Sequence, residues 1–388
     1  MDSSKTINIL HVTIGDGNYG GIASFLHTFY SYVDHQRFHF DVLYCGENSL
    51  KSKESDSVWS DSKIEVLHIL KKNNGISEYI RLLPKLKQKL YEKDYDIVHV
   101  ESNNPFLNAC VSILVNNQIV YISHSHNSKP NIISGSKGNR LIKKTISGLM
   151  RVIIRKKADA LFACSKEAGL YLFGEKGIRS NKFCIVPNAI ETGKFKFNKN
   201  IRQKLRNKEN FIIGFAGRLE LQKNPIFAVN VFYEILKKNQ NAVLWIIGDG
   251  DKKTAIEKRI KEFKIQDKVF MLGQRNDVSD LMQAMDILLF PSFYEGFGIV
   301  AIEAQCSGLR VAASDSVPDS VNLTGLVSFL PLSESPEYWA DYIISNQLME
   351  KNREDMSEII KNAGYDIKIA AEKLEDQYMM LLREKHKS

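Results

Sequence analysis

Short apolar runs alternate along the chain with longer stretches in which apolar residues recur at helical spacing. In the first half the runs occupy residues 7–14, 38–44, 64–69, 96–100, 119–123, 158–164 and 183–190, with helical patterns at 22–33, 77–92 and 105–115 between some of them. Apolar runs of about four to eight residues predict buried strands, and strands that alternate with helices predict a parallel sheet. The pattern therefore predicts a doubly wound α/β fold.

The same alternation begins again after a polar stretch at residues 191–200. Apolar runs follow at 211–217, 243–247, 269–272, 287–290, 310–314 and 327–330, and a last helical pattern covers 367–383. A chain of 388 residues is long enough for two domains, each with a core of its own. The predicted division is a first Rossmann-like domain at 1–190, a second at 191–365 and a terminal helix at 366–388.

The most informative stretch reads as strand, loop and helix over residues 286–308. Glu295 falls in the loop and Glu303 in the helix, while Gly296 and Gly298 leave backbone N–H groups accessible at a helix N-terminus, where anions are favoured. The two carboxylates would lie about 12 Å apart if both were helical, too far for a retaining glycosidase pair. The pattern favours one carboxylate at each end of an extended ligand with phosphate between them. The alternative is a buried turn with two solvated acids.

Two cations follow the first strand of the second half. Arg218 and Lys223 lie in the loop before a helix that begins at Pro225. An arginine fork and a lysine point charge suit a diphosphate. The alternative is a pair of ordinary exposed cations.

A histidine pair lies at the end of the strand predicted at 119–123. His124, His126 and Asn127 occupy the position where ligands bind in doubly wound folds, outside the carboxyl ends of the strands. Two histidines at this spacing without a third ligand nearby make a poor metal site, so no metal is expected here. The alternative is a loop histidine with satisfied hydrogen bonds.

A glycine-rich turn follows the first strand and makes a rival hypothesis. Residues 15–20 match G-x-G-x-x-G, with Asp41 and Glu47 in the distance range of a ribose contact. A dinucleotide-binding oxidoreductase would use this turn. Doubly wound domains in general need glycines at this position, which weakens the argument.

Glu295-Gly-Phe-Gly-Ile followed by Glu303 resembles the E-x7-E signature of retaining, group 1 (family 4) glycosyltransferases with the GT-B fold. His124-Ser-His126-Asn127 resembles the branch of that family that builds capsular polysaccharides and exopolysaccharides. The resemblance implies two Rossmann-like domains that face each other across a cleft, with a C-terminal helix that crosses back to the first domain. It assigns the acceptor to the first domain and the nucleotide sugar to the second.

The resemblance also assigns roles to particular residues. Donor binding falls to Gly20, Gly21, Arg218, Lys223, Gln274, Arg275, Glu295, Gly296, Phe297, Gly298 and Glu303. The catalytic assignments are His126 and Glu295, with His124 as the second choice of histidine and His124 and Asn127 as candidates for contact with the acceptor. No cofactor and no metal are expected, because the cations and the helix N-terminus can stabilise the departing diphosphate.

The function implied by the resemblance is transfer of a sugar, with retention, from a UDP-sugar to a lipid-linked saccharide in capsule, exopolysaccharide or O-antigen biosynthesis. Three alternatives stay open: an NAD(P)-dependent oxidoreductase, a nucleotide-sugar epimerase of the same fold, and a carbohydrate-binding subunit without activity.

Net charge and cysteine content bear on the location and the partners of the protein. The formal net charge is +8, and residues 137–157, which begin at Lys137 and end at Lys157, hold eight basic residues and no acid among apolar ones. A basic amphipathic helix suits an anionic membrane surface, although a solvated helix packed on the core fits equally well. Five scattered cysteines indicate neither disulfides nor zinc, and the N-terminus reads as a strand rather than a signal peptide. We expect a cytoplasmic protein, either soluble or peripheral on the inner face of the membrane, with no nucleic-acid partner.

Overall fold

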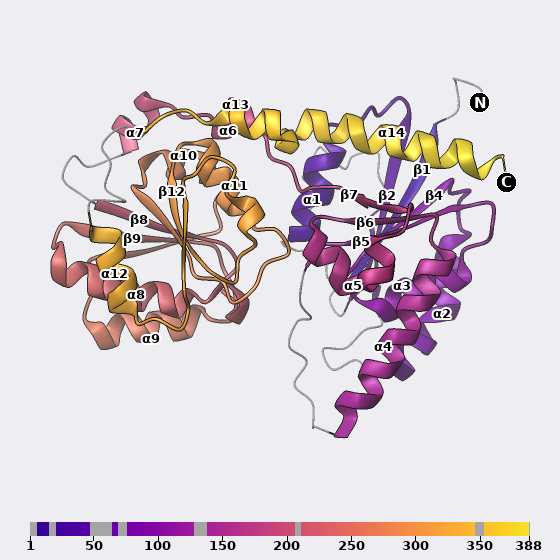
Figure 1. The fold of residues 1–388 in the computed structure, drawn as a ribbon, viewed down its shortest axis with the longest axis horizontal. Helices are drawn as coiled ribbons and strands as arrows, with labels where there is room; N and C mark the ends of the chain where they lie inside the picture. The colour runs from indigo at the N-terminus through magenta and orange to yellow at the C-terminus, as the bar shows by residue number, and fades with distance from the viewer. Residues whose placement is uncertain are drawn as a thin grey trace. The chain divides into compact units, whose positions relative to one another are not determined.

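The structure is a computed structural model that describes residues 6–14, 21–46, 64–68, 76–127, 138–205, 211–345 and 353–387. The chain forms two compact units. The first consists of Met1–Asn188 together with Ile367–Ser388, and the second is Ala189–Asp366. Each unit is an α/β structure built on one parallel sheet (Figure 1).

The first unit contains seven parallel strands in the order β3-β2-β1-β4-β5-β6-β7. They are β1 Ile7–Ile14, β2 Phe38–Gly46, β3 Ile64–His68, β4 Ile97–Glu101, β5 Val120–Ser125, β6 Ala160–Ala163 and β7 Phe183–Ile185. The helices are α1 Gly21–Tyr30, α2 Ile76–Leu90, α3 Pro105–Leu114, α4 Gly138–Lys157, α5 Lys166–Ile178 and α14 Ile367–Lys385. The strand order reverses between β1 and β4, which is where such folds bind ligands.

The terminal helix α14 belongs to the first unit, as predicted (Figure 1). Its Leu374 and Tyr378 are buried in this unit. Glu375 accepts a hydrogen bond from the backbone N–H of Asp34 at 2.7 Å, and Lys385 pairs with Asp159 at 2.8 Å. Residues from both ends of the chain therefore build this unit.

The second unit contains six parallel strands in the order β10-β9-β8-β11-β12-β13. They are β8 Phe211–Ala216, β9 Ala242–Ile247, β10 Val269–Gly273, β11 Ile287–Phe290, β12 Arg310–Ser314 and β13 Val327–Leu330. The helices are α6 Thr192–Phe195, α7 Lys199–Leu205, α8 Pro225–Lys238, α9 Lys253–Phe263, α10 Val278–Ala284, α11 Ile299–Cys306, α12 Pro336–Ile344 and α13 Ser357–Ile360, and the short turn η2 is Leu221–Lys223. Here the order reverses between β8 and β11.

The predicted doubly wound α/β class is confirmed in both units. The strand predicted at 96–100 lies one residue further on and ends at Glu101. A carboxylate in a buried strand does not match an apolar pattern, and Glu101 is fully buried. The helix predicted at 22–33 ends at Tyr30, because residues 31–33 form a turn.

Candidate functional site

In the second unit, the loops after β8, β9 and β10 are joined by backbone hydrogen bonds. Gly217 N–H donates to Ile247 at 3.0 Å, and Gly248 N–H donates to Gly273 at 2.7 Å. A Cβ on Gly248 would lie 2.0 Å from the Gly217 carbonyl oxygen, and φ at Gly248 is +128°. Only glycine fits this contact, so the backbone around Arg218 is held in place by its neighbours.

The loop after β11 is joined to the turn η2 in a similar way. Phe293 N–H donates to the Gln222 carbonyl at 2.8 Å, and the Gln222 side-chain amide donates to the Tyr294 carbonyl at 3.0 Å. These bonds bring the ammonium of Lys223 to 2.6 Å from Oε1 of Glu295. Two residues 72 positions apart, both predicted to bind the donor, therefore form one charged pair. Glu295 is 5% exposed, so the pair is largely shielded from water.

Arg218 lies near this pair but has its own partner. Its side chain is half exposed and donates to Glu220 Oε1 at 2.9 Å. Burial raises the pKa of the Tyr294 hydroxyl, Glu220 and Glu295 add to that increase, and Arg218 opposes it. The guanidinium is therefore paired with Glu220, and its charge also reaches Tyr294, the residue before Glu295.

Gly298 precedes the first residue of α11 with φ of +100°. A Cβ at this position would lie 3.1 Å from the ring of Phe290. Phe297, just before it, is buried and stacks on Tyr365 with ring centroids 5.1 Å apart. The ring of Phe297 therefore packs inside the unit. The donor-binding role predicted for this loop falls to the backbone of Gly296, Phe297 and Gly298.

Glu303 lies inside α11 and is partly buried. Burial raises the pKa of its carboxyl group to about 7, against the opposing charges of Lys194 and Lys223. Lys223 thus acts on both glutamates of the motif, directly on Glu295 and electrostatically on Glu303.

The remaining donor-binding predictions are placed as follows. Gln274 and Arg275 are exposed after β10, and Arg275 donates two hydrogen bonds to Asp277 at 2.7 and 2.6 Å. Gly21 begins α1. Gly20 and the rest of the glycine-rich turn at 15–20 lie outside the described residues.

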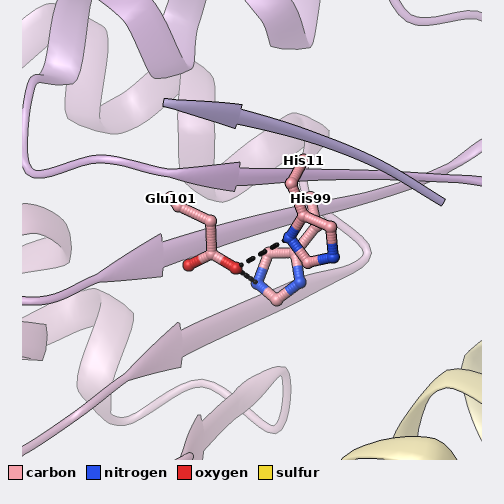
Figure 2. Close-up of side chains that lie close together, drawn as sticks. All are labelled: His11, His99 and Glu101. Atoms are coloured by element: carbon pink, nitrogen blue, oxygen red, sulfur yellow. Dashed lines mark hydrogen bonds and ion pairs between the residues drawn. The ribbon is translucent and has the colours of Figure 1, made fainter. Parts of the chain in front are cut away.

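In the first unit, four histidines surround the buried carboxylate of Glu101. His11 Nδ1 and His99 Nε2 lie 3.0 and 3.3 Å from Oε1. His124 Nδ1 and His126 Nε2 lie 2.9 and 2.5 Å from Oε2. We call these five residues the histidine cluster. Figure 2 shows His11 and His99 directed at the same carboxylate oxygen.

Strand register explains how these residues meet. His99 and Glu101 are two positions apart on β4 and so share one face of the sheet. His11 on β1 pairs with His99, and Glu101 pairs with His124 on β5. The side chain of Asn103 then holds the following loop by accepting the backbone N–H groups of His126 and Asn127 at 2.7 and 3.0 Å. Three adjacent strands therefore direct their polar side chains to one point.

The cluster corrects one inference from the sequence. His124 and His126 were predicted to lack a third ligand, yet Glu101 lies within hydrogen-bond distance of both. The alternation His-x-Glu at 99–101, followed on the next strand by His-x-His at 124–126, was the available signal. It could be used only with the register of β4 and β5.

Burial sets the protonation states of the cluster. Burial alone would raise the pKa of Glu101, but His99 and His124, with hydrogen bonds from His11 and His124, hold that pKa well below its ordinary value. Burial lowers the pKa of His99 well below the usual range and that of His124 to about 4. Glu101 is therefore ionised beside the neutral rings of His99 and His124.

Three ring nitrogens of the cluster have no hydrogen-bond partner among the described residues: His11 Nε2, His124 Nε2 and His126 Nδ1. His126 is the least buried of the four histidines. Its Nδ1 is a buried nitrogen without a hydrogen-bond partner among the described residues, on the least buried ring of the cluster.

Two doubly wound units with strand-end polar groups in each define an α/β protein of the GT-B type. The fold is similar to that of HepE from Anabaena, solved in complex with UDP and glucose, with a TM-score of 0.73 and 18% identity over 96% of this chain and 99% of that one. The chain belongs to the glycosyltransferases: the model of Glycosyltransferase Family 4 matches residues 19–194, and that of Glycosyl transferases group 1 matches residues 196–363.

Three relatives are similar over most or much of their length. The putative glycosyltransferase EpsF of Bacillus subtilis is 26% identical over 94% of both chains. The capsular polysaccharide biosynthesis glycosyltransferase CapH of Staphylococcus aureus is 25% identical over 88% of this chain and 90% of its own. The UDP-Gal:alpha-D-GlcNAc-diphosphoundecaprenol alpha-1,3-galactosyltransferase of Escherichia coli is 23% identical over 63% of this chain and 64% of its own.

Proposed function

We propose that the chain transfers a sugar, with retention, from a UDP-sugar to a lipid-linked saccharide in the biosynthesis of a cell-surface polysaccharide. The contact between Lys223 and Glu295 carries the donor half of this proposal. Lys223 supplies a cation for the diphosphate, and Glu295 supplies a carboxylate for the sugar. The turn and the loop that carry them are joined by hydrogen bonds. The acceptor half rests on the relatives, one of which acts on a diphosphoundecaprenol-linked sugar.

The second unit holds the donor in this proposal. Lys223, Arg218 and the backbone N–H groups at the start of α11 bind the diphosphate, where preorganised positive potential stabilises the leaving group without a metal. Glu295 binds sugar hydroxyls and Glu303 the ribose. The exposed loop at Gln274 and Arg275 contacts the base.

Transfer occurs by attack on the same face that the diphosphate leaves. The acceptor oxygen bonds to the anomeric carbon as the bond from that carbon to the diphosphate oxygen breaks, and the acceptor proton passes to the diphosphate. The imidazole of His126 lies at the reaction centre and hydrogen-bonds through Nδ1, while His124 and Asn127 line the approach of the acceptor. No covalent nucleophile is required.

A donor screen tests the donor half. A panel of UDP-, GDP- and TDP-sugars is added to the purified chain, and the melting temperature is recorded. A donor at 100 times its dissociation constant stabilises the protein by about 2.7 kcal/mol. We expect UDP-sugars alone to raise the melting temperature, and no response across the whole panel would rule the proposal out.

Product analysis tests the rest. The chain, the selected donor and undecaprenol-linked saccharides are incubated together, and the anomeric configuration of the product is read by NMR. Transfer with retention supports the proposal. The chain could instead bind the donor without turnover, and Glu295→Ala could change binding alone. That outcome would identify a carbohydrate-binding subunit.

Contact with the membrane through residues 137–157 is part of the same proposal. No helix in the described ranges is long and apolar enough to cross a bilayer. On α4, Leu149, Lys156 and Lys157 are exposed, whereas Arg155 donates to the Phe173 carbonyl at 2.8 Å. Cosedimentation with anionic vesicles should therefore weaken in a Leu149→Ser, Lys156→Glu, Lys157→Glu variant, and unchanged binding would count against the contact.

A further inference from the structure

The side of the histidine cluster formed by β1 and β4 brings three ligand atoms together. His11 Nδ1 and His99 Nε2 lie 3.0 and 3.3 Å from the same oxygen, Oε1 of Glu101 (Figure 2). All three side chains are at most 1% exposed. Imidazole nitrogens and a carboxylate oxygen are common ligands of transition metals.

A hydrogen bond between two rings leaves one nitrogen of the cluster available to a cation. His99 Nε2 lies 3.2 Å from His124 Nδ1, so one of these two nitrogens donates and the other accepts. His124 Nδ1 also lies 2.9 Å from Glu101 Oε2, and an ionised carboxylate only accepts, so a proton on His124 Nδ1 serves both contacts. His99 Nε2 is then bare, and it lies 3.3 Å from Glu101 Oε1.

From this clustering of three buried ligand atoms we infer that His11 Nδ1, His99 Nε2 and Glu101 Oε1 bind one divalent transition-metal ion of the zinc class. His99 Nε2 then directs its lone pair at the ion, and His124 Nδ1–H donates to Glu101 Oε2. Ligand atoms at 2.0–2.1 Å from a tetrahedral ion are separated by about 3.3–3.4 Å, close to the two distances observed here.

Charge supports the same assignment. Glu101 brings a negative charge into the interior, and its ion-pair partners among the described residues are histidines rather than lysine or arginine. A divalent ion beside Glu101 would offset that buried negative charge.

The surrounding hydrogen bonds are those of a metal site. The other nitrogen of His99, Nδ1, lies 2.8 Å from the Tyr378 hydroxyl, so a proton there can be donated to oxygen. The other oxygen of Glu101 bonds to His124 and His126. Such outer contacts fix the orientation of the ligands. The ion would join β1 to β4 and, through Tyr378, to α14, separately from the diphosphate groups of the second unit.

Metal analysis of the full-length chain tests the inference. The protein is grown with added zinc, purified without a tag, and measured by inductively coupled plasma mass spectrometry. We expect about one ion per chain. The ion is then removed with a chelator and Co²⁺ is titrated in, which should give visible ligand-field bands that saturate at one equivalent and disappear when Zn²⁺ is added.

Two variants locate the ion. Glu101→Gln keeps the shape of the side chain and should lose the stoichiometric ion and the Co²⁺ bands, as should His11→Gln. His386→Ala, at an exposed position, is the control and should keep both. Far-ultraviolet circular dichroism checks folding, and if one variant is unfolded the other variant and the wild-type titration decide. A metal-free wild type without Co²⁺ bands, or folded variants that bind like wild type, would overturn the inference.

Discussion

Glutamate takes three different states in this chain, set by what lies beside each carboxylate. Glu101 is held ionised by histidines, and Glu295 pairs with Lys223 at 2.6 Å. Glu303 has no ion pair with another of the described residues, and burial raises its pKa to about 7. The two acids of the E-x7-E motif therefore differ: Glu295 pairs with a cation, and Glu303 has a pKa close to neutral pH.

Glu303 should make the stability of the protein depend on pH. Its pKa is about 7 in the folded state against an ordinary 4.5, so between these values the folded state binds more protons. Its contribution is therefore fully present below about pH 4.5 and is lost as the pH rises through 7. Urea unfolding gives the free energy of unfolding of wild type and of Glu303→Gln at each pH. From pH 5 to pH 8 the value for wild type should fall relative to that for the variant, so that the difference between them shrinks or reverses. A difference independent of pH would contradict the raised pKa.

Lys223→Met should weaken binding of the donor. The variant removes a cation aimed at the diphosphate and leaves Glu295 buried without its charged partner, so we expect affinity to fall about 10- to 100-fold. Isothermal titration with the donor found in the screen measures this. Lys237→Met is the matched control, because Lys237 is an exposed lysine that pairs with Glu234. Equal effects of the two variants on affinity would show that Lys223 does not bind the donor.

At the scale of elements, close contact between loop backbones positions the charged side chains. The loops after β8 and β9 touch where Gly248 faces the Gly217 carbonyl and where Gly250 faces that of Leu219. Leu219 N–H also donates to the Asp249 carbonyl at 2.9 Å. Arg218 lies between these contacts, so its backbone cannot move without breaking them.

Gly248→Ala should displace the loop that carries Arg218. The new Cβ meets a backbone oxygen at 2.0 Å at a φ of +128°, and a conformation of this kind costs a non-glycine residue about 1–3 kcal/mol. We expect lower stability together with weaker donor binding. Gly193→Ala, where a Cβ meets nothing within 4 Å, should change neither. Thermal unfolding and donor titration of both variants give the comparison.

The sequence predicted the helices and strands better than it predicted contacts between distant residues. Apolar runs found both sheets, and the glycines around Glu295 gave the strand-loop-helix order, because these features depend on local periodicity. The contact between His11 and His99 depends on the pairing of β1 with β4. The end of β1 at Ile14 and the start of β4 at Ile97 are separated by 82 residues, and no local pattern contains the register of the two strands. Likewise the stacking of the Phe297 ring on Tyr365, far along the chain, is contained in no local pattern.

At the scale of the whole molecule, the first unit depends on the end of the chain. Leu374, Tyr378 and Leu381 of α14 are at most 6% exposed. Burying each such side chain contributes about 1.5–3 kcal/mol, so together they approach the net stability of a typical domain, about 5–15 kcal/mol. The second unit is one continuous segment and has its own core around Phe232 and Trp339.

A chain that ends at Asp366 should therefore lose the first unit and keep the second. Hydrogen exchange should become fast in β1 and β4 and stay slow in β8 and β9. Met380→Ala in the full chain is the control, because Met380 lies on the exposed side of α14, and it should leave both sheets protected. Retained protection of β1 and β4 in the shortened chain would show that α14 is dispensable.

The position of α14 also determines the order in which the protein can mature on the ribosome. Multidomain proteins generally complete their N-terminal part first as translation proceeds. Here Ala189–Asp366 is complete in sequence while the partner of β4 and β5, the helix Ile367–Lys385, has yet to be synthesised. We expect nascent chains that end at residue 366, followed by a linker long enough to clear the ribosomal exit tunnel, to resist protease in their later half and to be cut in their earlier half, so the segment made first would be the last to reach its native form.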